Sequence, residues 1–472
     1  MRLVLIFVFW GIATGLLAST PKLLVNEFVD VEMAASGAPG LAYTIFENGE
    51  IYSEARGEIL VGSGRKVTTE TPFLLGSISK SFTAMAVMQL VEAGKVELDA
   101  EISQYLEVFS TPAVRGITIR QLLSHTSGYS TFQGNIPHKD KSKSKDEHLS
   151  QIQQIAKWTP AYTPGSKWEY SNANYVILGF LIEALSGQDY ANYIKANILE
   201  PIGMEHSFVG DQKSHDMIAV GHRPWFGTKR PYKTIETERD GGIASAGGII
   251  ASASDMGLYL AIMLNDQDDI ISAESKSMMM RPASDASPYY GFGWSIDTED
   301  DAVFHTGISP GVETLAILVP AEQKGAVVLV NAGSGMGFGE TTNLRFGTSA
   351  KALGLDYIGN SGQWGRKILF LSFVALPIFF VIAMINLGLN RTGLYAKSGP
   401  FGAFSLWFPL LMTIGLAWTC LYLIPQLFGV SIGGLIVFLP DMAMAMVATA
   451  MTGVAWALLR LGLFYGGRPS AG

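Results

Sequence analysis

The chain of 472 residues is longer than one average domain, and its hydrophobic content of 48% lies at the top of the globular range. Its formal charge of −8 gives no support for nucleic-acid binding, so we expect no nucleic-acid partner. Cys420 is the only cysteine, which excludes disulfides and thiol catalysis from the rest of the chain.

Residues 1–20 carry one basic residue, then an apolar stretch and then small residues. This pattern predicts a secretory signal peptide, with an uncleaved anchor as the alternative. No cysteine follows the apolar stretch, so a lipoprotein is not expected. We therefore expect residues 21–365 to form an exported domain.

The expected exported region begins and ends with strand patterns. Residues 41–56 contain two strand-like runs joined by Asn48-Gly49, a strong hairpin signal. Further strand patterns lie near its end, at residues 302–305, 313–319 and 326–330. The helical patterns are at residues 81–93, 175–185, 254–264 and, as a closing helix, 341–353. We predict an α+β domain whose N-terminal hairpin pairs with the C-terminal strands in one antiparallel sheet.

Ser77 and Lys80 form an S-x-x-K pair at the start of a predicted helix. Ser63 and Ser142 match the same pattern, but only Ser77 precedes a helix that is apolar on nearly all sides and therefore buried. Burial and the helix N-terminus both lower the pKa of a lysine, and a neutral lysine can accept a hydroxyl proton. The backbone N–H of Ser77 can donate to a developing oxyanion. An ordinary N-cap would explain Ser77 but not Lys80.

Tyr170-Ser171-Asn172 is the second candidate motif. In an extended segment, Tyr170 and Asn172 project on the same side. A phenol beside Lys80 is expected to have a depressed pKa and to pass on a proton, and the Asn172 amide can hold a substrate amide. An ordinary turn before a helix, with Asn172 as the cap, would explain the same residues.

The strand segment His305-Thr306-Gly307-Ile308 is the third candidate. Gly307 would let a substrate backbone approach the strand, and the Ile308 N–H could be a second oxyanion donor. His305 and Thr306 would face the acyl group or a substrate carboxylate, although a lone histidine on a strand is often structural. If His305 binds a carboxylate as an imidazolium, activity on anionic substrates should fall above about pH 6.5.

Residues 366–472 contain three uncharged runs, each long enough to cross a bilayer, at about 368–387, 401–424 and 441–460. Residues 427–439 are shorter and suggest an interfacial or re-entrant connection. The positive-inside rule places the loop with Arg391 and Lys397 in the cytoplasm, together with the C-terminal tail. The run interiors hold no ionisable residue, so we expect no transport pathway.

The three motifs, Ser77-Ile78-Ser79-Lys80, Tyr170-Ser171-Asn172 and His305-Thr306-Gly307, resemble those of the penicillin-recognising serine hydrolases. That superfamily includes class C β-lactamases, D,D-carboxypeptidases, D-aminopeptidases and related esterases. The stretches LLSHTSGYS, PGSKWEYSN and GGIIASASDM are also similar. The resemblance covers roughly residues 25–350 and implies a β-lactamase-like domain.

The resemblance implies acyl transfer through an acyl-enzyme. The catalytic residues would be Ser77, Lys80 and Tyr170, and the choice of Lys80 or Tyr170 as base stays open. The oxyanion hole would use Ser77 and Ile308, and the substrate-binding residues would be Asn172, His305, Thr306 and Gly307. His305 stands where class C β-lactamases have lysine, which favours peptide or ester substrates over β-lactams.

The order of signal segment, hydrolase domain and three C-terminal spans resembles the colibactin-maturation peptidase. It implies a peptidase in a bacterial inner membrane, with its catalytic domain on the periplasmic or extracellular side. The substrates would be D-amino-acid-containing peptides or N-acyl peptide prodrugs, and the spans could support an oligomer. The alternatives are a D,D-carboxypeptidase or short-chain esterase of the same fold, and a catalytically silent ligand-binding sensor. No histidine spacing matches a metal motif, so we expect no metal and no cofactor.

Overall fold

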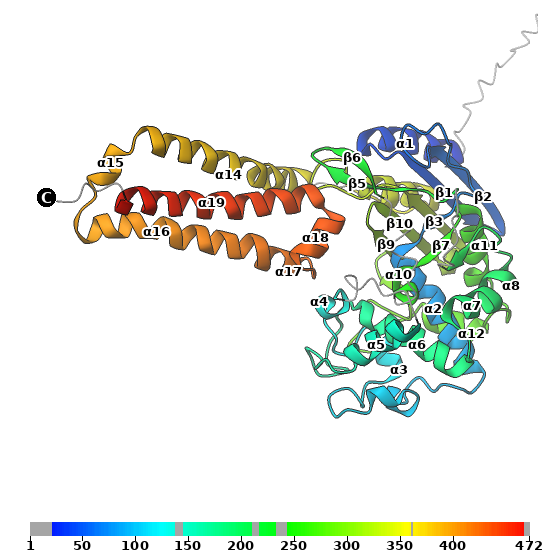
Figure 1. The fold of residues 1–472 in the computed structure, drawn as a ribbon. Coiled ribbons are helices and arrows are strands. Elements are labelled where there is room, and N and C mark those ends of the chain that lie inside the picture. Colours follow the sequence, from blue (N-terminus) through cyan, green and yellow to red (C-terminus); the bar gives the residue numbers. More distant parts are fainter. Residues whose placement is uncertain (1–20, 137–144, 210–216, 233–242, 360–361, 467–472) are drawn as a thin grey trace, which may run out of the picture.

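The computed structural model describes residues 21–136, 145–209, 217–232, 243–359 and 362–466. The expected signal peptide at residues 1–20 and the tail residue Arg468 lie outside the described residues. Figure 1 shows a body that contains the sheets and most short helices, and a bundle of long helices that extends from one side of it.

The centre of the body is an antiparallel sheet in the order β2-β1-β11-β10-β9-β8. Its strands are β1 (Gly40–Glu47), β2 (Glu50–Gly57), β8 (Ser295–Asp297), β9 (Ala302–Ser309), β10 (Val312–Val319) and β11 (Lys324–Val330). The N-terminal hairpin pairs with the C-terminal strands as predicted, with Leu41 opposite Val330. Asn48 and Gly49 have φ angles of 52° and 81°, the conformation that a two-residue hairpin turn needs.

The two faces of the sheet are covered by helices. Successive strand residues point to opposite faces, so Leu41 and Tyr43 meet Val25 of α1 (Pro21–Ser36) on one side. The closing helix predicted at residues 341–353 covers this side too, as η7 (Asn343–Gly347) followed by α13 (Thr348–Leu353). The opposite face joins the main core with α2 (Ser79–Glu92) and α11 (Ala253–Leu264). The predicted α+β fold is therefore confirmed.

A mostly helical region lies beside the sheet (Figure 1). Its longer helices are α5 (Lys145–Ile155), α6 (Asn172–Ser186) and α12 (Ala273–Met279). The short helices are α3 (Ile119–Leu123), α4 (Thr131–Gly134), α7 (Tyr190–Ile194), α8 (Glu200–Ile202) and α10 (Ala244–Gly247), with single turns η1 (Gly76–Ile78), η2 (Ile102–Gln104), η3 (Glu107–Phe109), η5 (Lys195–Leu199) and η6 (Pro320–Glu322). A small sheet is formed by β3 (Phe73–Leu74), β7 (Ile249–Ala251) and β4 (Phe208–Val209). The predicted helices 81–93, 175–185 and 254–264 correspond to α2, α6 and α11.

The long-helix bundle contains three helices that are long and apolar enough to cross a membrane: Gln363–Leu389, Gly399–Leu427 and Pro440–Gly466. The first is α14 and the third is α19, while the second comprises α16 (Gly399–Trp418), η8 (Thr419–Leu423) and α17 (Ile424–Leu427). Two short helices connect them, α15 (Thr392–Tyr395) and α18 (Ile432–Phe438). The predicted runs at 368–387, 401–424 and 441–460 fall within the three long helices. The predicted connection at 427–439 contains α18.

The bundle contacts the body through a hairpin that the sequence did not predict, β5 (Gly221–Trp225) and β6 (Thr228–Tyr232). The backbone N–H of Phe226, in its turn, donates to the buried carboxylate of Asp441 at the start of α19, 2.9 Å away. Arg223 donates to the carbonyl of Val437 at the end of α18, 3.0 Å away. Arg366 in α14 also forms a hydrogen-bonded ion pair with Glu340, at 2.6 Å. Several polar contacts therefore hold one end of the bundle against the body.

Candidate active site

Ser77 lies in the single turn η1, directly before the buried helix α2. Gly76 makes the turn with φ +57°, and a side chain at this position would collide with the backbone of β9. Ser77 does not cap the helix, since α2 begins without a side-chain cap and its N-cap position is Ile78. The ordinary N-cap interpretation is therefore wrong, and the Ser77 hydroxyl instead contacts Lys80.

The Lys80 side chain is fully buried. Its Nζ lies 3.0 Å from Ser77 Oγ, 2.8 Å from Asn172 Oδ1 and 2.6 Å from the carbonyl of Ala246 in α10. Desolvation lowers the pKa of Lys80 well below its ordinary value, as expected from the sequence. A neutral amine can donate its two hydrogens to Asn172 and Ala246 and turn its lone pair to the Ser77 hydroxyl.

Tyr170 lies just before α6, with its ring over the Lys80 amine at 4.9 Å from Nζ to the ring centroid. Burial raises the pKa of Tyr170, and a hydrogen bond with Ser77 only partly offsets this rise. The predicted depressed pKa is therefore wrong. Burial outweighs the influence of Lys80, because the same burial favours the uncharged amine. The phenol is placed to act as a hydrogen-bond donor rather than as a phenolate.

Asn172 is the first residue of α6 and holds Lys80 rather than an open position. Its Oδ1 accepts from Lys80, and its Nδ2 donates to Asn135 Oδ1 at 2.8 Å. The sequence suggested that this amide holds a substrate. In the structure both ends of the amide already have partners inside the protein.

The strand β9 brings Gly307 and Ile308 against η1. A Cβ on Gly307 would collide with the carbonyl of Leu75, which also accepts a 2.7 Å hydrogen bond from Thr314 Oγ1. Gly307 is therefore needed for the approach of the Leu75 backbone, whereas the sequence suggested the approach of a substrate. The backbone nitrogen of Ile308 lies close to Gly76, so the N–H groups of Ser77 and Ile308 belong to adjoining segments.

Beyond Phe304, strand β9 has no further partner on the β8 side among the described residues, because β8 pairs only with residues 302–304. Residues 305–309 thus form an edge that lies beside η1. The side chains along this edge differ in exposure: Ile308 is 57% exposed and Thr306 partly exposed. Edge backbone groups of this kind can pair with an added extended chain, such as a peptide.

His305 is buried, and both of its ring nitrogens have partners. Nδ1 lies 2.8 Å from the carbonyl of Thr306, and Nε2 lies 3.1 Å from the hydroxyl of Tyr290. Burial and the neighbouring Lys80 lower the pKa of His305 to about 3. The structure therefore contradicts an imidazolium at His305, whose buried ring contacts the hydroxyl of Tyr290.

The three motifs include none of four further residues of the site, one of which, His125, lies in the family-like stretch LLSHTSGYS. His125, with φ +59°, accepts through Nδ1 from the backbone N–H of Ser171 at 3.2 Å, and its ring centroid lies 4.4 Å from that of Tyr170. Thr131 Oγ1 donates to the carbonyl of Tyr170 at 2.6 Å. Asn135 contacts Asn172, and Ala246 contacts Lys80. Their roles depend on contacts between segments that lie far apart in the sequence, so a local sequence pattern does not predict them.

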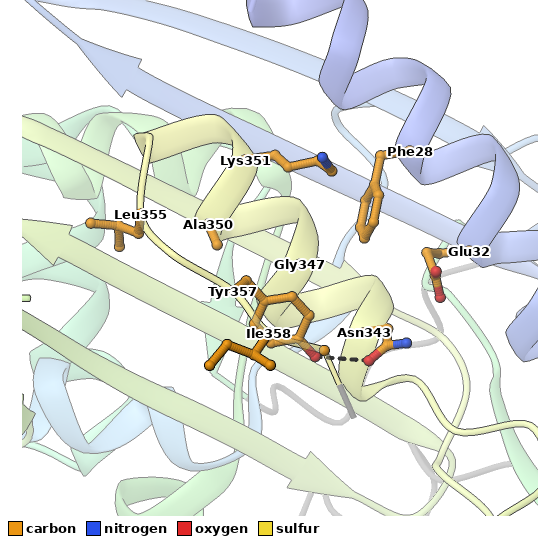
Figure 2. Close-up of a pocket in the computed structure, with 10 residues that line it drawn as sticks. Phe28, Glu32, Asn343, Gly347, Ala350, Lys351, Leu355, Tyr357 and Ile358 are labelled. Carbon is orange, nitrogen blue, oxygen red and sulfur yellow. Dashed lines mark hydrogen bonds between the residues drawn. The ribbon is translucent and has the colours of Figure 1, made fainter. Parts of the chain in front are cut away.

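A pocket of about 330 Å³ lies between α1 and the segment η7–α13, and Figure 2 shows its lining. None of the candidate active-site residues lines this pocket. The Tyr357 hydroxyl donates to Asn343 there, at 2.8 Å. In the described part of the chain, no group of three or more His, Cys, Asp or Glu side chains is arranged to hold a metal ion.

The family model described as Beta-lactamase matches residues 25–346, which is well over half of the chain. The chain belongs to the Beta-lactamase family. It is thereby a member of the penicillin-recognising serine hydrolases, as the three motifs indicated. The match ends before the long-helix bundle, so the family describes the body that holds Ser77.

The relatives and structures agree with this family. Protein flp of Staphylococcus aureus (strain N315) is 25% identical in an alignment of 324 residues that covers 66% of this chain and 63% of that protein. Penicillin-binding protein 4 of Amycolatopsis lactamdurans is 26% identical over 331 residues, covering 66% of this chain and 86% of the relative. The octameric penicillin-binding protein homologue of Pyrococcus abyssi is 27% identical with a TM-score of 0.61, covering 71% and 77% of the two chains.

Proposed function

We propose that the protein is a membrane-anchored serine hydrolase that forms an acyl-enzyme on Ser77. The observation that carries this proposal is the fully buried Lys80, whose Nζ lies 3.0 Å from the Ser77 hydroxyl. A lysine without solvent contact and with a lowered pKa can take the hydroxyl proton as Ser77 attacks a carbonyl carbon. The membership of the Beta-lactamase family supports the same chemistry.

The other site residues have roles that follow from their positions. The backbone N–H groups of Ser77 and Ile308 would donate to the oxyanion that forms when the carbonyl is attacked. Tyr170, with a raised pKa and a hydrogen bond to Ser77, would hand a proton to the leaving group and be reprotonated from Lys80. Water would then release the acyl group from Ser77. Lys80 is thus the base and Tyr170 the relay.

We propose amide or ester bonds of small acyl donors as substrates, in particular peptides that contain D-amino acids or carry an N-acyl cap. The open edge of β9 supports an extended peptide, because its backbone can add to the sheet beside Ser77. Relatives named as penicillin-binding proteins support D-amino-acid peptides. The alternatives are a D,D-carboxypeptidase, a short-chain esterase, and a silent binding protein.

We also propose that residues 366–472 anchor the hydrolase domain, residues 21–365, in a bacterial inner membrane. Three helices of sufficient length and apolarity support this. A signal peptide at residues 1–20 would place the catalytic domain on the periplasmic or extracellular side and the C-terminus in the cytoplasm.

The decisive experiment labels the full chain with a fluorescent fluorophosphonate and with a fluorescent penicillin. We expect a label on Ser77 that Ser77→Ala abolishes. Ser63→Ala is the matched control, since Ser63 begins another S-x-x-K match but lies in a turn. Labelling that persists in Ser77→Ala overturns the acyl-enzyme, and no label or turnover in the wild type favours the silent binding protein.

A further inference from the structure

The connection between the second and third long helices reaches the neighbourhood of Lys80. Gly429, between α17 and α18, accepts a hydrogen bond from Asn135 Nδ2 through its backbone carbonyl, at 2.8 Å. Gly429 has φ +68°, and a Cβ there would lie 2.6 Å from Cγ2 of Thr131 in α4. The loop backbone is therefore in direct contact with α4. A glycine is required at this contact both for its backbone conformation and for the space.

A chain of hydrogen bonds leads from this loop to Lys80. Asn135 Oδ1 accepts from Asn172 Nδ2 at 2.8 Å, and Asn172 Oδ1 accepts from Lys80 Nζ at 2.8 Å. In this series of hydrogen bonds, each asparagine side chain accepts through its oxygen on the side of Lys80 or Asn172 and donates through its nitrogen toward the loop. The carbonyl of Gly429 consequently fixes the rotation of Asn135, and Asn135 fixes the rotation of Asn172.

A second connection leads from the same loop to Tyr170. Thr131, which touches Gly429, donates through Oγ1 to the carbonyl of Tyr170 at 2.6 Å. The backbone N–H of Thr131 donates to the carboxylate of Glu169 at 2.9 Å. Thr131 of α4 therefore contacts both the segment before α6 and the loop at Gly429.

The loop does not serve to complete α4 as a helix. Ser130 and Gln133 already satisfy the start of α4 by a reciprocal capping box. Gly134 packs so tightly against the start of α6 that a side chain there would collide with Ser171. The contact with Gly429 thus adds a connection to the site beyond what the local fold needs.

We propose that residues 428–430 of the long-helix bundle are a positioning element of the active site, acting through Asn135 on Lys80 and through Thr131 on Tyr170. The bundle is then part of the catalytic unit as well as an anchor. This inference rests on the proposed hydrolase function. Asn135 and Gly429 are positioning residues, since neither touches the reacting atoms.

The test compares Gly429→Ala with Gly399→Ala in the full chain, purified in detergent. Both glycines have positive φ angles, +68° and +65°; Gly429 lies between α17 and α18, and Gly399 is the first residue of α16. Only Gly429 has a neighbour in the way, because nothing lies within 4 Å of a Cβ at Gly399. We expect Gly429→Ala to lower kcat for a short-chain ester about tenfold or more with KM within about twofold, and Gly399→Ala to retain wild-type kcat.

Asn135→Ala and the double variant with Gly429→Ala test the path. We expect Asn135→Ala alone to lower kcat about tenfold, and the double variant to fall no more than about twofold below the poorer single variant. Independent, multiplying effects contradict a shared path. Equal thermal unfolding midpoints in all variants separate positioning from loss of folding.

The outcomes distinguish this inference from the function on which it rests. A wild type that neither turns over esters nor accepts a fluorophosphonate on Ser77 overturns the proposed function. An active wild type whose kcat survives both Gly429→Ala and Asn135→Ala overturns only the positioning role. A change in KM with kcat unchanged also contradicts it, because that pattern assigns the loop to substrate binding alone.

Discussion

Lys80 is the base in the proposed acylation of Ser77. It has no solvent contact, yet its amine has acceptors in Asn172 and Ala246 and a hydroxyl in Ser77. None of these partners is an anion, so no counter-charge among them offsets the desolvation of an ammonium. Burial therefore lowers the pKa of Lys80, while the same burial raises the pKa of Tyr170. The two shifts together favour the lysine as base.

Replacing Lys80 tests this assignment. We expect Lys80→Met, which keeps the length and removes the amine, to slow the labelling of Ser77 by about 10²- to 10⁴-fold, the usual contribution of general-base catalysis. Lys66→Met is the control, since the Lys66 side chain is 72% exposed and belongs to the other described S-x-x-K match. Labelling kinetics measure both. A loss of less than a few-fold in Lys80→Met would assign the base to Tyr170.

The pH dependence of acylation follows from the lowered pKa of Lys80. Its neutral form is populated at lower pH than that of an ordinary lysine, so acylation should level off well below pH 10.4, the approximate unperturbed value. The rate should then decline as acidification protonates the amine. Labelling rates across pH 5 to 10.5 measure this. A rate that climbs tenfold per pH unit up to about 10 contradicts a shifted lysine.

His305 provides an independent prediction. Its pKa, lowered to about 3, keeps the ring neutral throughout the range in which an ordinary histidine titrates. The ratio of kcat/KM for an anionic and a neutral acyl donor of the same size should therefore stay constant between about pH 5 and 8. A fall in this ratio across about pH 6.5 would restore the imidazolium that the sequence suggested.

These pKa shifts show what the sequence permits at the residue scale. The buried pattern of the helix after Ser77 correctly predicted the shift of Lys80, because burial is readable from composition. The shift of Tyr170 was predicted with the wrong sign, since the nearby lysine was given more weight than burial. The buried ring of His305 depends on Tyr290, a residue with no sequence signal that connects the two.

At the scale of elements, the approach of β9 to η1 sets the geometry around Ser77. A Cβ at Gly307 would collide with Leu75 and Thr314. We expect Gly307→Ala to push the strand from the turn and to lower kcat by about 10²- to 10³-fold, the cost of losing one oxyanion donor.

The control for this change is Gly325→Ala in β11, where the nearest atoms to a Cβ are 3.2 Å away and mostly on side chains. Steady-state kinetics with a short-chain ester compare the two. Near-normal kcat in a folded Gly307→Ala protein shows that the N–H of Ile308 does not stabilise the oxyanion.

The elements also differ in how well the sequence predicts them. Asn48-Gly49 identified the first hairpin, and the strand-like runs on either side of it correspond to β1 and β2. The hairpin of β5 and β6 turns at Phe226-Gly227 and contains prolines at 224 and 231, so its sequence does not resemble a typical strand pair. The contact of Gly429 with Asn135 joins residues 294 positions apart, and no local pattern predicts it.

At the scale of the whole molecule, the proposed topology can be tested with the single cysteine. Cys420 is buried, so a maleimide should react little with the wild type. Ile358→Cys places a thiol at a residue that is 98% exposed, before α14, whereas Gly393→Cys lies in the connection between α14 and α16, with open space around it. A membrane-impermeant maleimide applied to intact spheroplasts should label only Ile358→Cys.

Permeabilising the spheroplasts should make Gly393→Cys reactive as well. Labelling of Gly393→Cys but not of Ile358→Cys in intact spheroplasts reverses the proposed orientation. Equal labelling of both positions before permeabilisation shows that the first long helix does not cross the membrane.

The contact between the β5–β6 hairpin and the start of α19 also limits how far Ser77 can move relative to the long-helix bundle. No flexible linker separates the body that holds Ser77 from the bundle among the described residues. The contacts of Asp441 and Arg223 and the Arg366–Glu340 ion pair hold the two together. If the bundle anchors the protein as proposed, the Ser77 hydroxyl stays at a nearly fixed distance from the membrane surface. Its encounters are then governed by two-dimensional diffusion, and turnover of a lipid-dissolved acyl donor should depend on the donor's density per membrane area rather than on its bulk concentration.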